Sequence, residues 1–191
     1  MLSPDEHDLS ARLEAVTADT FRFVGEPVGE RPHMPDYGVE TDRWQALPWS
    51  WAAQRLTEAR NYWVVTVSAA GRPHALPVWG VWDDSEHRFC FSCGPRSRKA
   101  ANLAANPQVS VAPEDTVEAV SVEGTAAVVH DEPRREWWIS RYLMKYAPIS
   151  PGLGAEFLRE NLLVEVTPER AFAIIEREPE FATRATRWRF S

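Results

Sequence analysis

The sequence predicts a single domain that is mainly β, with helices at its periphery. Segments rich in β-branched and aromatic residues follow one another between residues 62 and 130, with Gly, Pro and Asp at the turns between them. Apolar residues at helical spacing are confined to a few short segments. The 191 residues, 44% of them hydrophobic, suffice for one domain with a substantial core. Within it, we expect an N-terminal helix and arm over residues 1–60, packed on a main body with a C-terminal tail over residues 61–191.

The N-terminal part is predicted to contain two helices separated by an irregular segment. A capping box at residues 3–6 and apolar residues at helical spacing predict a helix over residues 3–19. Residues 20–47 are rich in Pro, Gly and charge, which indicates an irregular arm on the surface. A Pro near the start of residues 48–56 favours a second helix.

The main body is predicted to be a meander of strands with helices inserted. Pro77 and Gly80 interrupt the second strand, which indicates a sheet edge or a bulge there. Pro168 and Glu169 predict a turn between the last two strands. The expected strands are residues 62–68, 73–82, 87–93, 109–112, 117–130, 162–167 and 171–176, and the expected helices are residues 98–105, 134–146 and 156–160.

Bulk composition restricts the classes of partner. A net charge of −7 argues against a general binder of nucleic acid or of anionic membranes. No stretch approaches the roughly 20 apolar residues of a membrane span, and the N-terminus is acidic, unlike that of a signal peptide. We therefore expect a cytoplasmic protein.

Motifs for metal binding or nucleophilic catalysis are not evident. Cys90 and Cys93 match C-x-x-C, but residues three apart on a strand face opposite sides, and the sequence has no second Cys pair. The five histidines show no metal-ligand spacing. We expect no metal site, and no nucleophile elbow, paired carboxylates or Gly-rich phosphate loop are found.

One short segment has the chemistry of an anion site. Ser97, Arg98 and Lys99 follow a Gly-Pro turn and open the helix predicted over residues 98–105. Two cations, a hydroxyl and the free N–H groups of a helix N-terminus can converge there on one phosphate. The alternative is a solvated basic face.

Between Tyr62 and Asp131, a series of short motifs occurs in a specific order. They are Gly-Arg-Pro-His, Pro-Val-Trp, Phe-Cys-Phe-Ser-Cys, Ser-Arg-Lys, Ala-Asn-Leu, Asn-Pro and Val-Glu-Gly-Thr-Ala. This order resembles the pyridoxamine 5′-phosphate oxidase-like superfamily of split β-barrels, which bind flavin or deazaflavin. The resemblance implies a homodimer with the cofactor in a groove between protomers.

The resemblance also implies which residues hold the cofactor. Arg98 and Lys99 would bind its phosphate, with a hydrogen bond from Ser97. Trp188, in the Arg-Trp-Arg-Phe ending, would close over the cofactor region; the alternative is a packing anchor. The residues that would border the flavin-type ring are Ala75, Leu76, Pro77, Val78 and Trp79, with Ser92 and Cys93 across from them on the neighbouring strand. For Trp79 alone, packing in the core or at the dimer contact is the alternative.

Two departures from the family pattern argue against oxidation of vitamin B6. The oxidases themselves have an Arg in the second strand, where this chain has a position near Ala75, and a C-terminal Trp/Arg/His motif that is missing here. The Ser-Arg-Lys, Ala-Asn-Leu and Arg-Trp-Arg-Phe motifs resemble the branch that uses coenzyme F420, although relatives that bind FMN share most of them.

The resulting expectation is an oxidoreductase that transfers a hydride between bound coenzyme F420, or FMN, and a small organic substrate. The cofactor carries the chemistry, which accounts for the lack of a catalytic triad. A non-catalytic carrier of flavin, deazaflavin or haem on the same barrel is the first alternative. An interaction domain without a cofactor is the second.

Overall fold

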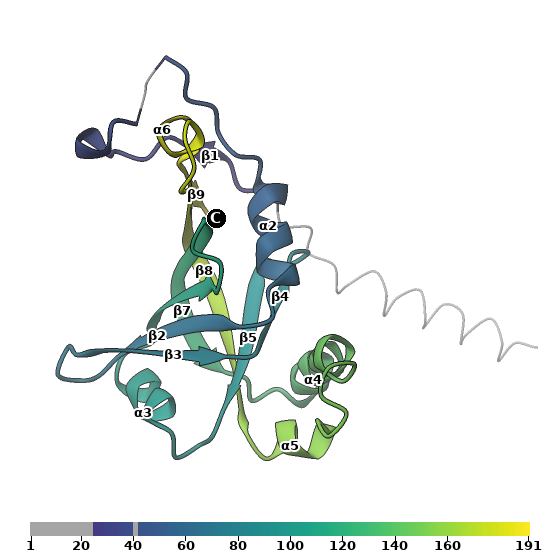
Figure 1. Cartoon of the computed structure of the whole chain (residues 1–191). Helices are drawn as coiled ribbons and strands as arrows, with labels where there is room; N and C mark the ends of the chain where they lie inside the picture. The colour runs from purple at the N-terminus through teal and green to yellow at the C-terminus, as the bar shows by residue number, and fades with distance from the viewer. Residues whose placement is uncertain (1–24, 40–41) are drawn as a thin grey trace, which may run out of the picture.

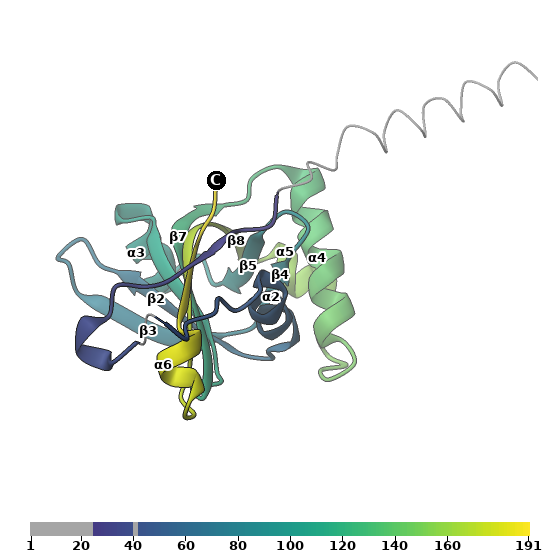
Figure 2. The same ribbon diagram turned by 90° about the horizontal axis from the view of Figure 1, so that it is seen from above.

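The computed structural model of the protein describes residues 25–39 and 42–191, and a nine-stranded antiparallel sheet is its main element. Helices lie around the sheet, and Figure 2 shows α2, α4 and α5 gathered on one side of it. The strands are β1 (Gly29–Glu30), β2 (Tyr62–Val67), β3 (Pro73–Val78), β4 (Gly80–Asp83), β5 (Arg88–Cys93), β6 (Gln108–Pro113), β7 (Glu118–Val128), β8 (Leu162–Ile175) and β9 (Thr186–Arg189) (Figure 1). The helices are the 3-10 turn η1 (Pro35–Tyr37), α2 (Trp49–Glu58), α3 (Arg98–Ala105), α4 (Glu132–Tyr146), α5 (Ala155–Arg159) and α6 (Glu180–Arg184).

The sheet closes into a barrel that is split at one residue. Its strands pair in the order β1-β9-β8-β7-β6-β2-β3, and β5 pairs with both β4 and β8. Trp79 is the single residue between β3 and β4, so these two strands are successive halves of one stretch of chain. From β2 the pairing runs through β6, β7, β8 and β5 to β4, and the chain joins β4 through Trp79 to β3, which pairs with β2. This closed path confirms the predicted split β-barrel with peripheral helices.

Most of the predicted elements are present at nearly the predicted bounds. α3 occupies the predicted residues, and its start is explained locally, because the Ser97 hydroxyl accepts the N–H of Ala100 as an N-cap. α4 begins in the same way, with the Asp131 carboxylate accepting the N–H of Arg134. The predicted interruption of the second strand is the break at Trp79. The helix predicted over residues 3–19 lies outside the described residues.

The two strands predicted around Pro168 are one strand, β8, which corrects the predicted turn. The pairing of β7 with β8 shifts register between Glu123 and Gly124, opposite Pro168. A Cβ added to Gly124 would lie 2.2 Å from the carbonyl oxygen of Thr167, so only glycine allows the two strands to approach this closely. The irregularity accommodates a proline that donates no hydrogen bond, and the strand continues.

The arm and the tail also contain pairing that the sequence did not reveal. β1 lies in the predicted irregular arm and pairs with β9, which lies in the C-terminal tail. Glu30 joins them further by accepting hydrogen bonds from Arg187 and Arg189. Two segments nearly 160 residues apart thus extend the sheet beyond β8.

The core consists of two apolar clusters on opposite faces of the sheet. The larger contains Trp49 and Leu56 of α2 together with Trp188 of β9. The smaller lies under α4. Cys93 belongs to the first and Cys90 to the second, both as free thiols, so the two cysteines do face opposite sides of β5. None of the helices in the described part of the chain has the length and apolarity that crossing a membrane requires.

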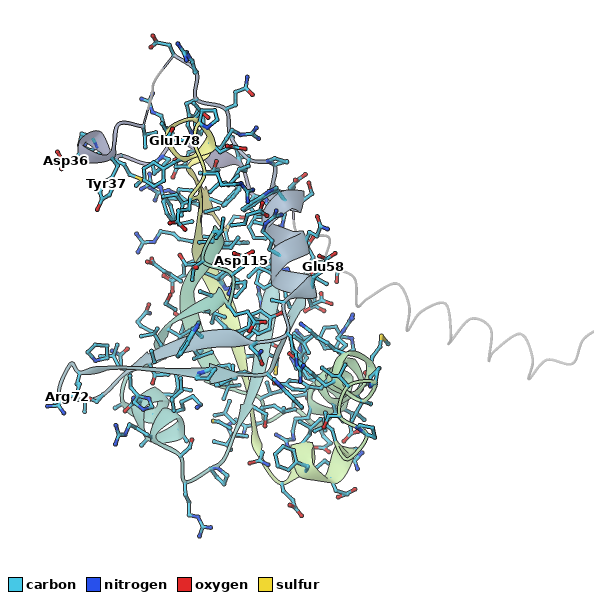
Figure 3. All side chains as sticks on the ribbon, viewed as in Figure 1. Asp36, Tyr37, Glu58, Arg72, Asp115 and Glu178 are labelled. Atoms are coloured by element: carbon cyan, nitrogen blue, oxygen red, sulfur yellow. The ribbon has the colours of Figure 1, made fainter. Side chains whose placement is uncertain are left out.

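The hairpin of β2 and β3 projects from the body (Figure 1), with Arg72 at its tip (Figure 3). Both of its faces are partly uncovered. Trp63 of β2 is 46% exposed, and Leu76 of β3 is 42% exposed. Because Trp63 pairs with Pro77 and Val64 pairs with Leu76, these two side chains point to opposite faces of the hairpin.

Candidate cofactor site

A cavity of about 550 Å³ lies where the split in the barrel meets the start of α3 and the region of α4 and α5. This volume is typical of small-molecule sites. Its walls come from three parts of the chain: the end of β3 with Trp79, the end of β5 with the turn into α3, and the segment from α4 to the start of β8. The lining residues are Pro77, Val78, Trp79, Ser92, Cys93, Gly94, Ser97, Lys99, Tyr142, Ser150, Gly152, Leu153, Phe157, Leu158 and Asn161.

One wall has the features of an anion site. Ser97 and Lys99 line the cavity at the N-terminus of α3. Ser97 satisfies the N–H of Ala100, whereas the N–H groups of residues 98 and 99 lie in the first turn, where a helix has no carbonyl partner for them. A cation, a hydroxyl and the positive end of a helix are thus present together. Asn102 anchors this helix to the barrel, because its buried Nδ2 donates to Thr66 Oγ1 of β2 at 2.9 Å.

The second wall, formed by the break in the barrel, is held by two tyrosines of α4. Trp79 stacks on Tyr146 with ring centroids 4.7 Å apart and an interplanar angle of 4°. The Tyr142 hydroxyl donates to the carbonyl of Trp79 and accepts the N–H of Ser92 on β5. Tyr146 Oη accepts the N–H of Gly80 at 2.9 Å. The backbone groups that the interrupted strand leaves unpaired are thereby satisfied.

A partly buried lysine contacts the same break in the barrel. Lys145 Nζ donates to the hydroxyl of Tyr62 at 2.7 Å and to the carbonyl of Gly80 at 3.1 Å. Burial of the ammonium group lowers the pKa of Lys145 to about 8. Burial has the opposite effect on the phenols, and raises the pKa of Tyr146 to about 12. Tyr142 and Tyr146 are therefore neutral hydroxyls that donate and accept hydrogen bonds.

Cys93 is the nucleophilic side chain of the cavity, but its environment favours the thiol. Burial raises the pKa of Cys93, against the lowering effects of a hydrogen bond with Ser97 and of the charge of Lys99. Among the described residues, no cluster of three or more His, Cys, Asp or Glu side chains is arranged to hold a metal ion.

The third wall was not anticipated from the sequence. It is formed by the loop after α4 and by α5, and it contributes Ser150, Gly152, Leu153, Phe157, Leu158 and Asn161. The sequence predicts helices over residues 134–146 and 156–160, but nothing in the spacing of residues 150–161 marks them as a site. Only the folding of α4 and α5 back onto the end of β5 brings them to the cavity.

The cavity unites seven of the eleven residues that the sequence suggested for the cofactor: Pro77, Val78, Trp79, Ser92, Cys93, Ser97 and Lys99. Arg98 is exposed and does not belong to this lining. Ala75 and Leu76 are exposed on β3 and do not line it. Trp188 is fully buried in the larger core cluster, edge-on to Trp49 with ring centroids 5.5 Å apart, and so has a packing role there.

Comparison with solved structures shows the same fold in several bacterial proteins. The conserved hypothetical protein Rv2991 from Mycobacterium tuberculosis superposes with a TM-score of 0.60 and 19% identity, over 72% of this chain and 90% of the other. HutZ, the haem storage protein from Vibrio cholerae, gives 0.53 and 21% identity over 63% and 89% of the two chains. A pyridoxamine 5′-phosphate oxidase homologue from Listeria innocua gives 0.52 and 15% identity over 65% and 95%.

At the level of sequence, no curated protein matches this chain. The family model described as pyridoxamine 5′-phosphate oxidase matches residues 52–175. These residues run from within α2 to the end of β8 and include every strand of the closed barrel as well as the whole cavity lining. The chain therefore belongs to the pyridoxamine 5′-phosphate oxidase family.

Proposed function

We propose that this protein is an oxidoreductase that binds coenzyme F420, with FMN as the alternative, and transfers a hydride between the cofactor and a small organic substrate. The observation that supports this most is the composition of the cavity. A cationic, hydroxyl-bearing helix N-terminus at Ser97 and Lys99 and an apolar wall at Pro77, Val78 and Trp79 line one space of about 550 Å³. A phosphorylated compound with a flat ring requires this pairing of features.

The residues present fit such a cofactor. Lys99, Ser97 and the first N–H groups of α3 would hold its phosphate. The ring would lie along Pro77, Val78 and Trp79, with Ser92 and Cys93 beside it. When bound, a deazaflavin supplies two-electron hydride transfer, whereas FMN also permits reaction with oxygen. The protein's own contribution is to position the ring and exclude water. Tyr142 and Tyr146 keep Trp79 in place at the break in the barrel strand.

The β2–β3 hairpin supports a further proposal, that the protein works as a homodimer. Trp63 and Leu76 expose large apolar surfaces on opposite faces of a hairpin that projects from the body. A second copy packed on the exposed face of β3 that carries Leu76 would bury this side chain and would place β3 at the contact between the two copies. Sedimentation analysis of the protein and of a Leu76→Glu variant tests this proposal: a dimer that dissociates in the variant supports it, and a monomeric wild-type protein contradicts it.

A carrier protein without catalytic activity is the competing function, because the haem storage protein HutZ shares this fold. Cofactor binding alone does not separate an enzyme from a carrier. Measured hydride transfer from the cofactor to an acceptor separates them, because a carrier would release its cofactor unchanged.

The experiment is a fluorescence titration of the cofactor-stripped protein with FMN and, separately, with coenzyme F420, followed by turnover with reducible conjugated compounds. Tight binding of F420 together with turnover supports the proposal in its first form, and the same result with FMN supports the alternative. Binding without turnover indicates a carrier. If neither compound binds, the proposal is wrong.

A further inference from the structure

The third wall of the cavity differs in chemistry from the anion-binding wall. Its apolar part consists of Leu153, Phe157 and Leu158, and its polar part of Ser150 and Asn161. No charged side chain belongs to this wall among the described lining residues. The cation of the cavity, Lys99, belongs to the wall at the start of α3. The cavity therefore has a cationic part and an uncharged, largely apolar part.

The apolar wall is held in place by charged groups on its outer side. Arg159 at the end of α5 binds both carboxylate oxygens of Glu136 on α4, at 2.8 and 2.9 Å. Arg135 of α4 donates to the carbonyl of Arg159. A two-point Arg–carboxylate contact fixes orientation as well as distance. α5 is thus fixed on α4, although it has only five residues, and Leu158 is buried beneath it.

Phe157 is unusual for an aromatic residue, because 57% of its surface is exposed although it lines a cavity. Covering the exposed part of this ring with a ligand would remove apolar surface from water, which favours binding. Leu153 lies partly buried in the same wall, and the buried side chain of Tyr142 also lines the cavity. A flat apolar molecule would cover these surfaces.

The polar atom that this wall offers is an acceptor. Asn161 Nδ2 donates to the carbonyl of Phe157 at 2.7 Å, and this contact identifies the nitrogen of the amide. The opposite atom, Oδ1, lies near Gly94, where an added Cβ would be 3.7 Å from it. Because both Asn161 and Gly94 line the cavity, Oδ1 is placed to accept a hydrogen bond from a ligand there.

We propose that this wall is a subsite for a planar, uncharged aromatic or conjugated molecule that carries a hydroxyl or N–H group. The flat apolar part would contact Phe157 and Leu153, and the hydroxyl or N–H would donate to Asn161 Oδ1. An ionised group would lose its hydration at this wall without gaining an opposite charge, so anionic molecules are disfavoured. The inference rests on the proposed function in one respect: it assigns this molecule as the substrate of the cofactor bound at Ser97 and Lys99.

The test measures the binding of two probes to the full-length protein by ligand-observed nuclear magnetic resonance, with and without FMN or coenzyme F420. 2-Naphthol is flat, neutral and a hydrogen-bond donor, and 2-methoxynaphthalene has the same rings without the donor. We expect 2-naphthol to bind about threefold to tenfold more tightly than the ether, as expected for one net hydrogen bond.

Two variants and one control assign the binding to this wall. Phe157→Ala should weaken both probes to a similar extent, by about threefold to tenfold. Asn161→Leu should abolish the preference for 2-naphthol, and this ratio does not change if the variant merely loosens α5. Met144→Ala is the control, because Met144 lies on α4, is 77% exposed and is absent from the cavity lining. It should change neither affinity.

The possible results separate the two proposals. If a cofactor binds through Lys99 but both probes are indifferent to Phe157→Ala, or 2-naphthol is not preferred to the ether, the subsite is wrong and the proposed function stands. If the probes behave as expected and neither cofactor binds, the subsite stands as a binding site and the proposed function is wrong. If Met144→Ala weakens the probes as much as Phe157→Ala does, the binding is not at this wall and the inference is overturned.

Discussion

Trp79 and Tyr146 stack almost in parallel, with ring centroids 4.7 Å apart and an interplanar angle of 4°. Trp79 is the residue at which the barrel strand breaks, and Tyr146 is the last residue of α4. The same tyrosine accepts the N–H of Gly80, the first residue after the break. Tyr146 therefore contacts both residues at the break in the barrel strand, and one of them, Trp79, lines the cavity. The shape of the site thus depends on the docking of α4.

Replacing Tyr146 with Phe tests this dependence, because the ring and its stacking are kept and the hydroxyl is lost. The buried N–H of Gly80 would then lack its partner. We expect the free energy of unfolding, measured by chemical denaturation, to fall by about 1–3 kcal/mol. Cofactor affinity should fall as well. An unchanged free energy of unfolding would show that the Tyr146 hydroxyl does not stabilise the break in the barrel strand. Met144→Ala, on the exposed face of the same helix, is the control.

Lys99 and Arg98 are adjacent cations that the structure places differently, since Lys99 lines the cavity and Arg98 does not. Lys99→Ala should weaken binding of FMN or coenzyme F420 by about 1.5–3 kcal/mol, as expected for a hydrogen bond to a charged group. Arg98→Ala removes the same charge one residue away and should have a clearly smaller effect. Equal losses in a fluorescence titration would mean that general attraction, and not contact, is responsible.

His87 should make stability depend on pH. It is buried, adopts φ of 49° and lies in contact with the rings of Trp49 and Phe190. Burial lowers its pKa below the ordinary value of 6.5, against the raising effect of Asp84. The unfolded chain therefore binds the proton more readily than the folded protein, and stability should fall as pH decreases through about 6.5.

The matched variant is His87→Asn, because asparagine tolerates a positive φ and does not titrate in this range. As the pH falls from 8 to 5, the free energy of unfolding of the wild-type protein should decrease more than that of the variant, by at most about 1.4 kcal/mol per pH unit from this one group. Chemical denaturation at each pH measures this difference. Identical pH profiles would show that the His87 pKa is not lowered by folding.

Lys145 should have an effect at alkaline pH. Its pKa is lowered from 10.5 to about 8 by burial, so the unfolded chain holds this proton through a range in which the folded protein has lost it. Stability should therefore rise as pH increases from about 8 to about 10.5, by roughly 1–3 kcal/mol from this group. Lys145→Met should remove the rise. A variant with the same alkaline profile as the wild-type protein would contradict the lowered pKa.

The elements that the sequence predicted well are those whose signals are local. α3 begins where Ser97 caps it, and α4 begins where Asp131 does. The break at Trp79 follows from Pro77 and Gly80, which are poor partners within a sheet. The position of Ser97 and Lys99 together at the start of α3 was predictable for the same reason, because a cap, a cation and a helix start are neighbours in the chain.

The elements that the sequence did not reveal depend on partners distant in the chain. β1 is a strand only because it pairs with β9, and β9 in turn pairs with β8. β8 continues through Pro168 because Gly124, more than forty residues earlier, lets the neighbouring strand approach. The packing of Trp188 against Trp49 also depends on residues far apart in the chain. Nothing near Trp188 in the sequence distinguishes a core residue from one that covers a ligand.

The sequence by itself determined the split barrel, its family and one end of the candidate site, because strand patterns, turns and helix caps are properties of neighbouring residues. The tertiary structure decided which predicted residues share a cavity, and it added the wall of Phe157, Leu158 and Asn161. It also separated Lys99 from Arg98, which the sequence could not distinguish. The physical reason is that a cavity is the space between packed elements, so its lining depends on how α4 and α5 dock on the barrel.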